Sequence, residues 1–269
     1  MRVPADHYIR LVVSLSKKTL GGNLVSIVLF GSYARNEASK VSDVDLLIVV
    51  RMYDDSAQRL EKLLRKVSIS YGITFEPKGM FGKLLYALSQ ATGMFRPAFV
   101  AEEKDILAWR FHRVFRVSRF MSRLLAPSES VKFTIGKSYR VLYGKDVLRM
   151  IKTSKPTLGE IIRSLLMNML LAFCSFVLVP LHRETYRFVY EAVKWSLFNY
   201  AYVSRRPPRI LELSRLFMEP VRRGMEHFLN TRNNGRLSPG LLLYALPAIL
   251  KIHIASIRAL MARRRTKSS

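Results

Sequence analysis

Acidic residues are scarce in this chain of 269 residues: 19 Asp and Glu stand against 45 Lys and Arg, a formal net charge of +26. Residues 1–76 hold 11 basic and 8 acidic residues, which leaves 34 basic and 11 acidic residues, or +23, for the rest. A charge of this sign attracts polyanions, nucleic acid first and anionic membranes second. The alternative is that the charge reflects a basic proteome or a surface that serves only solubility.

Cysteine is almost absent, and histidine is sparse. The lone Cys174 excludes an intramolecular disulfide and a cysteine-based zinc site. The five histidines show no metal-ligand spacing. No N-terminal stretch combines basic, apolar and cleavage regions, so we expect a cytoplasmic protein.

Charge is also missing from residues 164–181, "SLLMNMLLAFCSFVLVPL", a run almost long enough to cross a bilayer. Asn168, Pro180 and the flanking Arg163 and His182 leave no margin in length for a membrane span. A helix buried on all sides of a bundle has the same composition. We therefore expect a core helix here, and a membrane is not an expected partner.

The rest of the pattern predicts two domains, with an α+β (mixed α/β) domain over residues 1–125 and a basic all-α helical bundle over residues 126–269. The first domain alternates helices and strands. These elements are expected as helices at 4–20, just after 31–32, at 54–67 and at 81–90, and as strands at 25–30, 43–50, 69–75 and 95–101. The second domain is expected to contain helices at 159–179, 183–203, 210–229 and 239–262.

Two aspartates, Asp43 and Asp45, lie in the predicted strand that ends at Val50. Residues two apart in a strand point to the same side, where two carboxylates repel unless a cation compensates them. Hard oxygen ligands at this spacing suit Mg²⁺ or Mn²⁺. Earlier in the chain, Gly31 and Ser32 end a strand and open a helix, a place where backbone N–H groups can bind phosphate.

Together these elements form "FGSYARNEASKVSDVDL", which resembles the signature of the DNA polymerase beta nucleotidyltransferase superfamily, and its minimal nucleotidyltransferases in particular. Asn36 stands where that signature usually has Gly. The resemblance covers roughly residues 25–50, and "VLYGKDVL" at 141–148 weakly resembles the end of such domains.

The resemblance implies transfer of a nucleoside monophosphate from a nucleoside triphosphate, with ATP favoured, to a hydroxyl group. Asp43 and Asp45 would hold two Mg²⁺ ions, or Mn²⁺ in their place, and act as catalytic residues. Gly31 and Ser32 would bind phosphates, although Ser32 could instead cap its helix. Arg35 would contact a phosphate or pair with a carboxylate of the sheet.

Active relatives have a third carboxylate on a later strand, which can accept the proton of the attacking hydroxyl. Glu76, at the end of "ISYGITFE", is the first candidate for that catalytic role, and Glu102 and Glu103 are the second. None of them lies in the middle of an apolar strand. A descendant that has lost catalysis and only binds is therefore an alternative.

A basic stretch, "RFHRVFRVSRFMSR", follows these strands. Its arginines have helical spacing and are candidates for nucleic-acid binding: Arg110, Arg113, Arg116, Arg119 and Arg123. Interleaved phenylalanines could stack on bases, or they could belong to the core of an amphipathic helix. With the basic second half, this stretch favours RNA or tRNA as the acceptor. A small molecule of the aminoglycoside type, a protein partner as in antitoxin-like relatives, and a degenerate nucleic-acid-binding protein are the alternatives.

Overall fold

The computed structural model describes residues 5–38, 42–71, 98–178, 186–217, 221–222 and 240–266. The chain divides into two compact units. The sheet unit comprises Met1–Ser122 and Ser138–Lys152, and the helical unit comprises Arg123–Lys137 and Thr153–Ser269. This confirms the expected fold class, an α+β part followed by a helical part.

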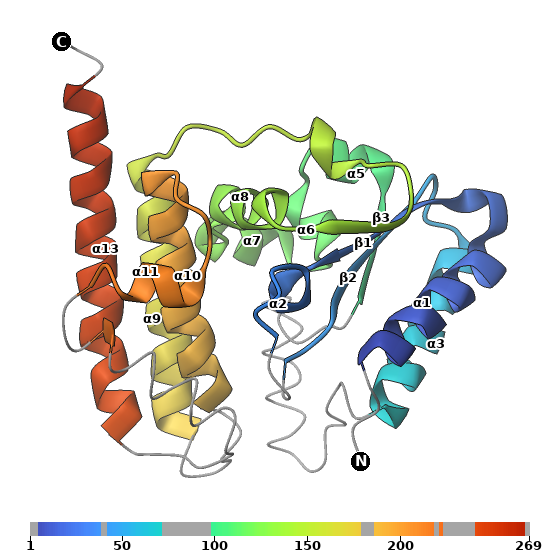
Figure 1. The fold of residues 1–269 in the computed structure, drawn as a ribbon, viewed down its shortest axis with the longest axis horizontal. Helices are drawn as coiled ribbons and strands as arrows, with labels where there is room; N and C mark the ends of the chain where they lie inside the picture. Colours follow the sequence, from blue (N-terminus) through green and yellow to red (C-terminus); the bar gives the residue numbers. More distant parts are fainter. Residues whose placement is uncertain are drawn as a thin grey trace. The chain divides into compact units, whose positions relative to one another are not determined.

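A mixed sheet of four strands forms the centre of the sheet unit (Figure 1). The strands are β1 (Leu24–Phe30), β2 (Asp45–Val50), β3 (Ala98–Glu102) and β4 (Arg140–Gly144). Their order is β3-β2-β1-β4. Strand β1 is antiparallel to both β2 and β4, and β2 is parallel to β3.

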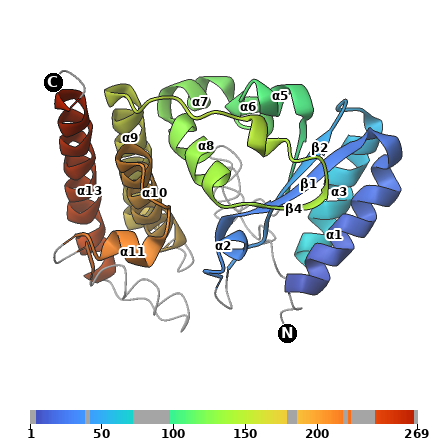
Figure 2. The ribbon, with the colours of Figure 1, turned by 45° about the horizontal axis from the view of Figure 1, so that its top comes forward.

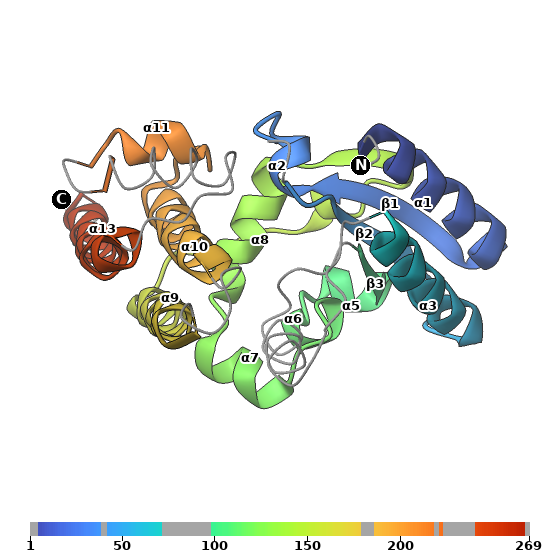
Figure 3. The ribbon, with the colours of Figure 1, turned by 90° about the horizontal axis from the view of Figure 1, so that it is seen from below.

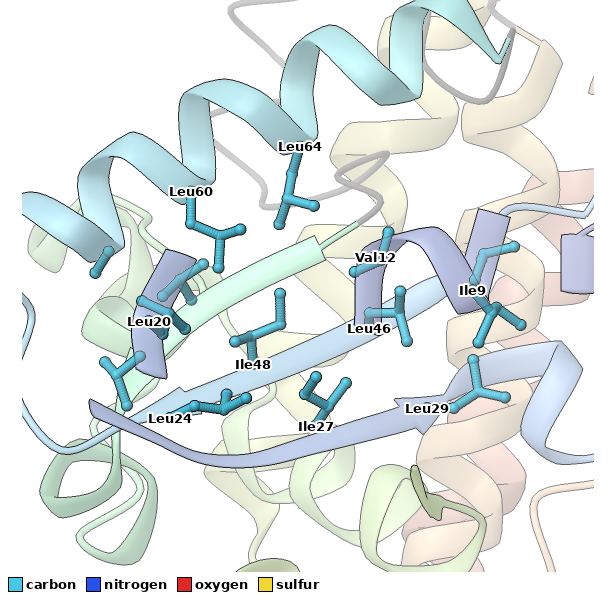
Figure 4. Packing of buried hydrophobic residues seen from close by; sticks show 14 of the residues in the cluster. Ile9, Val12, Leu20, Leu24, Ile27, Leu29, Leu46, Ile48, Leu60 and Leu64 are labelled. Carbon is cyan, nitrogen blue, oxygen red and sulfur yellow. The ribbon is translucent and has the colours of Figure 1, made fainter. Parts of the chain in front are cut away.

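One face of this sheet is covered by α1 (Ala5–Leu20) and α3 (Asp55–Ser70) (Figures 1 and 4). The Asp54 carboxylate caps α3 by accepting a hydrogen bond of 3.0 Å from the Ala57 N–H. Apolar residues at helical spacing on α1 and α3 meet every second residue of the strands, as the two periodicities require. This core contains Ile9, Val12, Leu20, Ile27, Leu29, Leu46, Ile48, Leu60, Leu64 and Val100.

The alternate strand residues form the second face of the sheet. The short helices α5 (Glu103–Leu107) and α6 (Phe111–Val114) follow β3 in the chain and contact it. Phe99 of β3 makes an edge-to-face contact with Phe115, with ring centroids 5.1 Å apart. Phe30 of β1 lies 6.3 Å from Phe99 on the same face. The remaining short elements of the sheet unit are η1 (Gly21–Asn23), α2 (Gly31–Ala34) and η2 (Leu148–Met150).

Three long helices pack side by side in the helical unit, and Figure 3 shows them almost end-on. They are α9 (Leu158–Leu178), α10 (Tyr186–Ser204) and α13 (Gly240–Arg265). The shorter α8 (Ser128–Lys137) packs on α10, and α11 (Ile210–Ser214) follows α10 in the chain (Figure 2). Helix α7 (Arg119–Leu125) spans the boundary between the two units. By length and composition alone, α9 and α13 could cross a membrane.

Buried polar side chains connect the three long helices. Asn168 of α9 donates to Ser196 Oγ of α10 over 2.9 Å. His253 of α13 lies 3.2 Å from Ser164 Oγ of α9 and 2.8 Å from the carbonyl oxygen of Ile249. The side chain of His253 is 1% exposed, and burial lowers its pKa to about 4. The histidine is therefore neutral at physiological pH.

Several expected elements differ from the observed ones. Residues 138–152 belong to the sheet unit because β4 pairs with β1, so a single boundary at residue 125 does not separate the two units. Residues 69 and 70 extend α3 in place of a strand, and the helix expected from residue 210 ends at Ser214. The helix expected at 81–90 lies outside the described residues. Helix α9 is not buried on all sides, since one of its faces is exposed.

Candidate functional site

The Gly-Ser turn and the aspartate strand meet where β1 ends and β2 begins. Phe30 and Asp45 are partners in the antiparallel register, so Gly31, which follows Phe30, lies beside the Asp45 carboxylate. Gly31 adopts φ +76°, and a Cβ atom at this position would overlap Asp45 Oδ2. Only glycine fits a position with both constraints. The expected juxtaposition of the turn and an aspartate is therefore present.

Asp43 lies two residues before Asp45, outside the strand that was expected to include it, since β2 begins at Asp45. Both residues are partly exposed, and the Oδ1 atom of Asp43 is buried. Partly exposed carboxylates next to a glycine backbone are a donor set that suits Mg²⁺ and leaves further coordination positions for a triphosphate and water. Among the described residues, no group of three or more acidic, histidine or cysteine side chains is placed to hold a metal.

The turn after Gly31 is a single helical turn, α2, whose carbonyl groups bond to the backbone that follows. Arg35 N–H donates to the Gly31 carbonyl over 3.2 Å, and Glu37 N–H donates to the Ser32 carbonyl over 2.9 Å. Phe30 occupies the N-cap position of α2, so Ser32 lies inside the helix and does not cap it. The phosphate-binding role of Ser32 stays a prediction.

Arg35 and Asn36 shape the end of this turn. The Arg35 side chain is 7% exposed and pairs with the Glu37 carboxylate of the turn at 2.8 Å. Asn36 adopts φ +57°, the left-handed conformation that glycine and asparagine tolerate. The departure from the family signature at Asn36 therefore preserves the backbone geometry.

The candidates for the third carboxylate do not join the two aspartates in the described residues. Glu76 lies outside the described residues. Glu102 is the register partner of Val50, at the end of β2 opposite to Asp45, roughly 16 Å along the strand. It pairs with Lys104 at 2.5 Å and accepts from the Tyr53 N–H, and both bonds lower its pKa. Glu103 pairs with Lys145 at 2.8 Å. Glu102 and Glu103 are therefore structural at the far end of the sheet.

The arginine stretch is not one helix. It breaks at Arg116, which has φ +54°, between α6 and α7. Arg110 and Arg113 both contact Asp105 Oδ1, at 3.0 and 3.3 Å. The Arg116 guanidinium lies 3.6 Å from the centre of the Tyr53 ring. Three of the five arginines thus make intramolecular contacts.

Arg119 and Arg123 differ, because both are exposed and make no ion pair within the described part of the chain. Phe120 between them is 71% exposed, whereas Phe115 is buried at 7%. Phe111 is partly exposed, so Phe120 of α7 presents the most open ring for stacking on bases.

Sequence reasoning missed the aromatic cluster on the face of the sheet that carries Asp45. Phe99 is the register partner of Leu47. Leu47 lies two residues after Asp45 and therefore on the same face of the sheet, and Phe99 is 4% exposed. Trp109 and Phe111 also contact Phe115 in this cluster. The dense spacing of aromatics in "FHRVF" was a signal, but the strand pairing that brings Phe99 to them is not a local property.

Comparison with known proteins agrees with this geometry. Residues 13–73 match the nucleotidyltransferase domain family. Two proteins of Methanocaldococcus jannaschii, both named as protein adenylyltransferases, are similar to this chain. One is 40% identical over 65 residues, 23% of this chain and 44% of its own length. The other is 34% identical over 76 residues, 28% of this chain and 76% of its own length.

A solved structure resembles the chain over most of its length. The crystal structure of a spectinomycin adenyltransferase from Enterococcus faecialis, with ATP and spectinomycin, superposes with a TM-score of 0.55 at 10% identity. The match covers 93% of this chain and 98% of that one, so the likeness in fold includes the helical part. The 34% identical relative is matched over three quarters of its own length. This match and the geometry at Gly31 and Asp45 agree with the resemblance of residues 25–50 to the nucleotidyltransferase signature. The chain therefore belongs to the nucleotidyltransferase family of the DNA polymerase beta type.

Proposed function

We propose that this protein transfers AMP from ATP to a hydroxyl group of an acceptor. The observation that carries the proposal is the close approach of Gly31 to the Asp45 carboxylate, within a domain of this family. A glycine backbone at a carboxylate leaves room for a triphosphate beside a metal ligand. The names of the two relatives support adenylyl transfer over transfer of another nucleotide.

In the proposed reaction, the acceptor oxygen forms a bond to the α-phosphorus of ATP, and the bond from that phosphorus to the bridging oxygen breaks. Pyrophosphate leaves, and the hydroxyl proton passes to a base or to water. Asp43 and Asp45 would hold Mg²⁺, which when bound neutralises the negative charge of the triphosphate. The turn at Gly31 and Ser32 would orient the phosphates through backbone N–H groups.

The charge of the chain supports an anionic acceptor, and RNA or tRNA is the one we favour. The residues after Glu76 carry +23, and Arg119 and Arg123 are exposed next to the exposed Phe120. Phosphate contacts from arginine and stacking on phenylalanine are a common mode of binding single-stranded RNA. An aminoglycoside carries protonated amino groups, and a field of this sign disfavours it.

A small hydroxylated molecule is the second candidate, because the likeness to the spectinomycin enzyme extends over the helical part. An acceptor protein is the third, since both relatives are named as protein adenylyltransferases. Both candidates keep the same chemistry at the α-phosphorus. Only the group that presents the hydroxyl differs.

The test is incubation of the full chain with α-labelled ATP, Mg²⁺ and a cell extract, next to an Asp43→Asn, Asp45→Asn double variant. Label that appears only with the wild type, and that ribonuclease removes, supports RNA. Label that protease removes identifies a protein acceptor, and label in the small-molecule fraction identifies the second candidate. Incorporation at the wild-type level by the double variant would refute the site itself.

A further inference from the structure

The outward side of α9 is apolar along its whole length. Six residues spaced three or four apart form one line on the helix, as residues at this spacing do. We call this line the outer stripe, and it consists of Leu158, Ile162, Leu166, Leu170, Phe173 and Val177. Each of these side chains is between 36% and 61% exposed. The opposite side of α9 holds buried residues such as Ser164, Asn168 and Leu171. Of these, Asn168 bonds to α10 and Ser164 contacts α13.

Such a stripe is unusual for the surface of a globular protein. An amphipathic helix normally puts charged residues on its exposed face, and a long exposed apolar patch marks a binding surface. Helix α9 has no charged residue after Arg163, and its neighbouring positions Leu165 and Met169 are also apolar. The stripe is roughly 30 Å long at 1.5 Å per residue. Something apolar is therefore expected to cover it.

The charge of the protein argues for a lipid surface. Two copies of a chain with a net charge of +26 repel each other, which opposes pairing of one stripe with another. An anionic membrane attracts the same charge and offers an apolar layer beneath its headgroups. Helix α13, which packs on α9, exposes Lys251 and Arg258, and these have no ion-pair partner among the described residues.

The packing of α9 favours a helix that lies on the membrane over one that crosses it. Within the part of the chain that the structure describes, only one side of α9 is free of protein, because Asn168 bonds to Ser196 of α10 and Ser164 contacts His253 of α13. Helix α10 also carries an ion pair between glutamate and lysine side chains, Glu191 and Lys194, which a bilayer core would have to accommodate if the bundle spanned it. We propose that the outer stripe seats the helical unit on the surface of a membrane rich in anionic lipids.

The test measures cosedimentation of the full chain with vesicles of phosphatidylcholine, either alone or with about 30% phosphatidylglycerol, the anionic component that the charge requires. The stripe variant is Leu166→Gln, Leu170→Gln, Phe173→Gln. The matched control is Met52→Gln, Leu63→Gln, Met150→Gln, which changes three exposed apolar residues of the sheet unit. We expect the wild type and the control to bind anionic vesicles alike, and the stripe variant to bind roughly tenfold or more weakly.

A second readout separates insertion from adsorption by charge. A Phe173→Cys variant in a Cys174→Ser background is labelled with an environment-sensitive fluorophore, and Met150→Cys in the same background is the control. Lipids brominated in the acyl chain should quench the label at position 173 and not the label at 150. Circular dichroism of all variants checks that they are folded.

Three outcomes would overturn the proposal. The wild type could fail to bind anionic vesicles, or the folded stripe variant could bind as well as the wild type. Without lipid, the wild type could be a dimer and the stripe variant a monomer, which would make this face an interface between copies. None of these measurements uses nucleotidyl transfer, so the proposed enzymatic function is tested separately.

Discussion

Gly31 and Asp45 are held against each other by the pairing of β1 with β2: Phe30 pairs with Asp45, and the next residue turns with φ +76° over the carboxylate. The end of β1, the glycine turn and the Asp45 carboxylate thus lie in direct contact. The position of the carboxylate depends on the absence of a side chain at residue 31.

Replacing Gly31 by alanine should remove transferase activity with little loss of the fold. The new Cβ atom would overlap Asp45 Oδ2 and would force an L-residue into a left-handed conformation. We expect a loss of about 100-fold or more in kcat/KM. Gly22→Ala is the matched control, because a Cβ atom there has no neighbour within 4 Å. Equal activity of the two variants would contradict the packing described at Gly31.

Glu76 is the remaining candidate for the third carboxylate, since the sequence has no other acidic residue between it and Glu102. Glu76→Gln is therefore expected to lower kcat by about 100-fold, as loss of a general base does. Glu103→Gln, at the far end of the sheet, should change kcat less than about twofold. The comparison measures release of pyrophosphate from ATP in the presence of the acceptor that the labelling experiment identifies. If both variants keep wild-type rates, two carboxylates suffice for the reaction.

The left-handed conformation of Asn36 gives a prediction for stability. Asn36→Gly should leave the free energy of unfolding within about 0.5 kcal/mol of the wild type, because glycine accepts φ +57° freely. Asn36→Val should cost about 1–2 kcal/mol, since a β-branched residue is strained there. Urea denaturation measures both. A valine variant as stable as the glycine variant would show that the turn relaxes to another conformation.

The arginines of the basic stretch should separate into two classes. Arg119→Gln with Arg123→Gln should leave stability unchanged, weaken RNA binding, and reduce the slope of log affinity against log salt by about 1–2. Removal of the same charge on α3, by Lys62→Gln with Lys66→Gln, is the control and should have a smaller effect.

Arg116→Ala, in contrast, should lower the free energy of unfolding by about 1–2 kcal/mol, because its guanidinium lies on the Tyr53 ring and its Nε atom is buried. RNA affinity measured on the folded Arg116→Ala protein should stay near that of the wild type. A strong loss of RNA binding in this variant would place Arg116 in the acceptor site.

The parts of the site that sequence could predict are those set by neighbours in the chain. The Gly31 turn and Asp45 occur within one signature, and the start of the helix at residue 54 was predicted from the sequence around it. Glu102 was a candidate because it ends an apolar strand, but the parallel pairing of β3 with β2 puts that end away from Asp45. Strand direction is a tertiary property that strand pattern does not contain.

The basic stretch and α9 show two further limits. Helical spacing of arginines continued through Arg116 in the sequence, whereas in the fold its contact with Tyr53 accompanies a break in the helix. In α9 apolar residues occur on every side of the helix, so periodicity did not indicate which side α10 and α13 would cover. The exposed stripe became visible only once the neighbours of α9 were placed.

His253 makes the stability of the protein depend on pH. Its pKa in the folded state is about 4, below the ordinary value of 6.5, because burial between α9 and α13 disfavours the charged ring. Below pH 6.5 the unfolded chain binds a proton that the folded chain does not, so stability should fall as the pH decreases from 6.5 towards 4. The full loss attributable to this residue, reached below pH 4, is on the order of 3 kcal/mol, and about 2 kcal/mol of it falls between about pH 7.5 and about pH 5. Urea denaturation at about pH 7.5 and about pH 5 measures it, and His253→Gln, which cannot titrate, should lose less stability between the two values. If the variant loses as much as the wild type, other groups cause the pH dependence, and the neutral His253 that contacts Ser164 does not govern it.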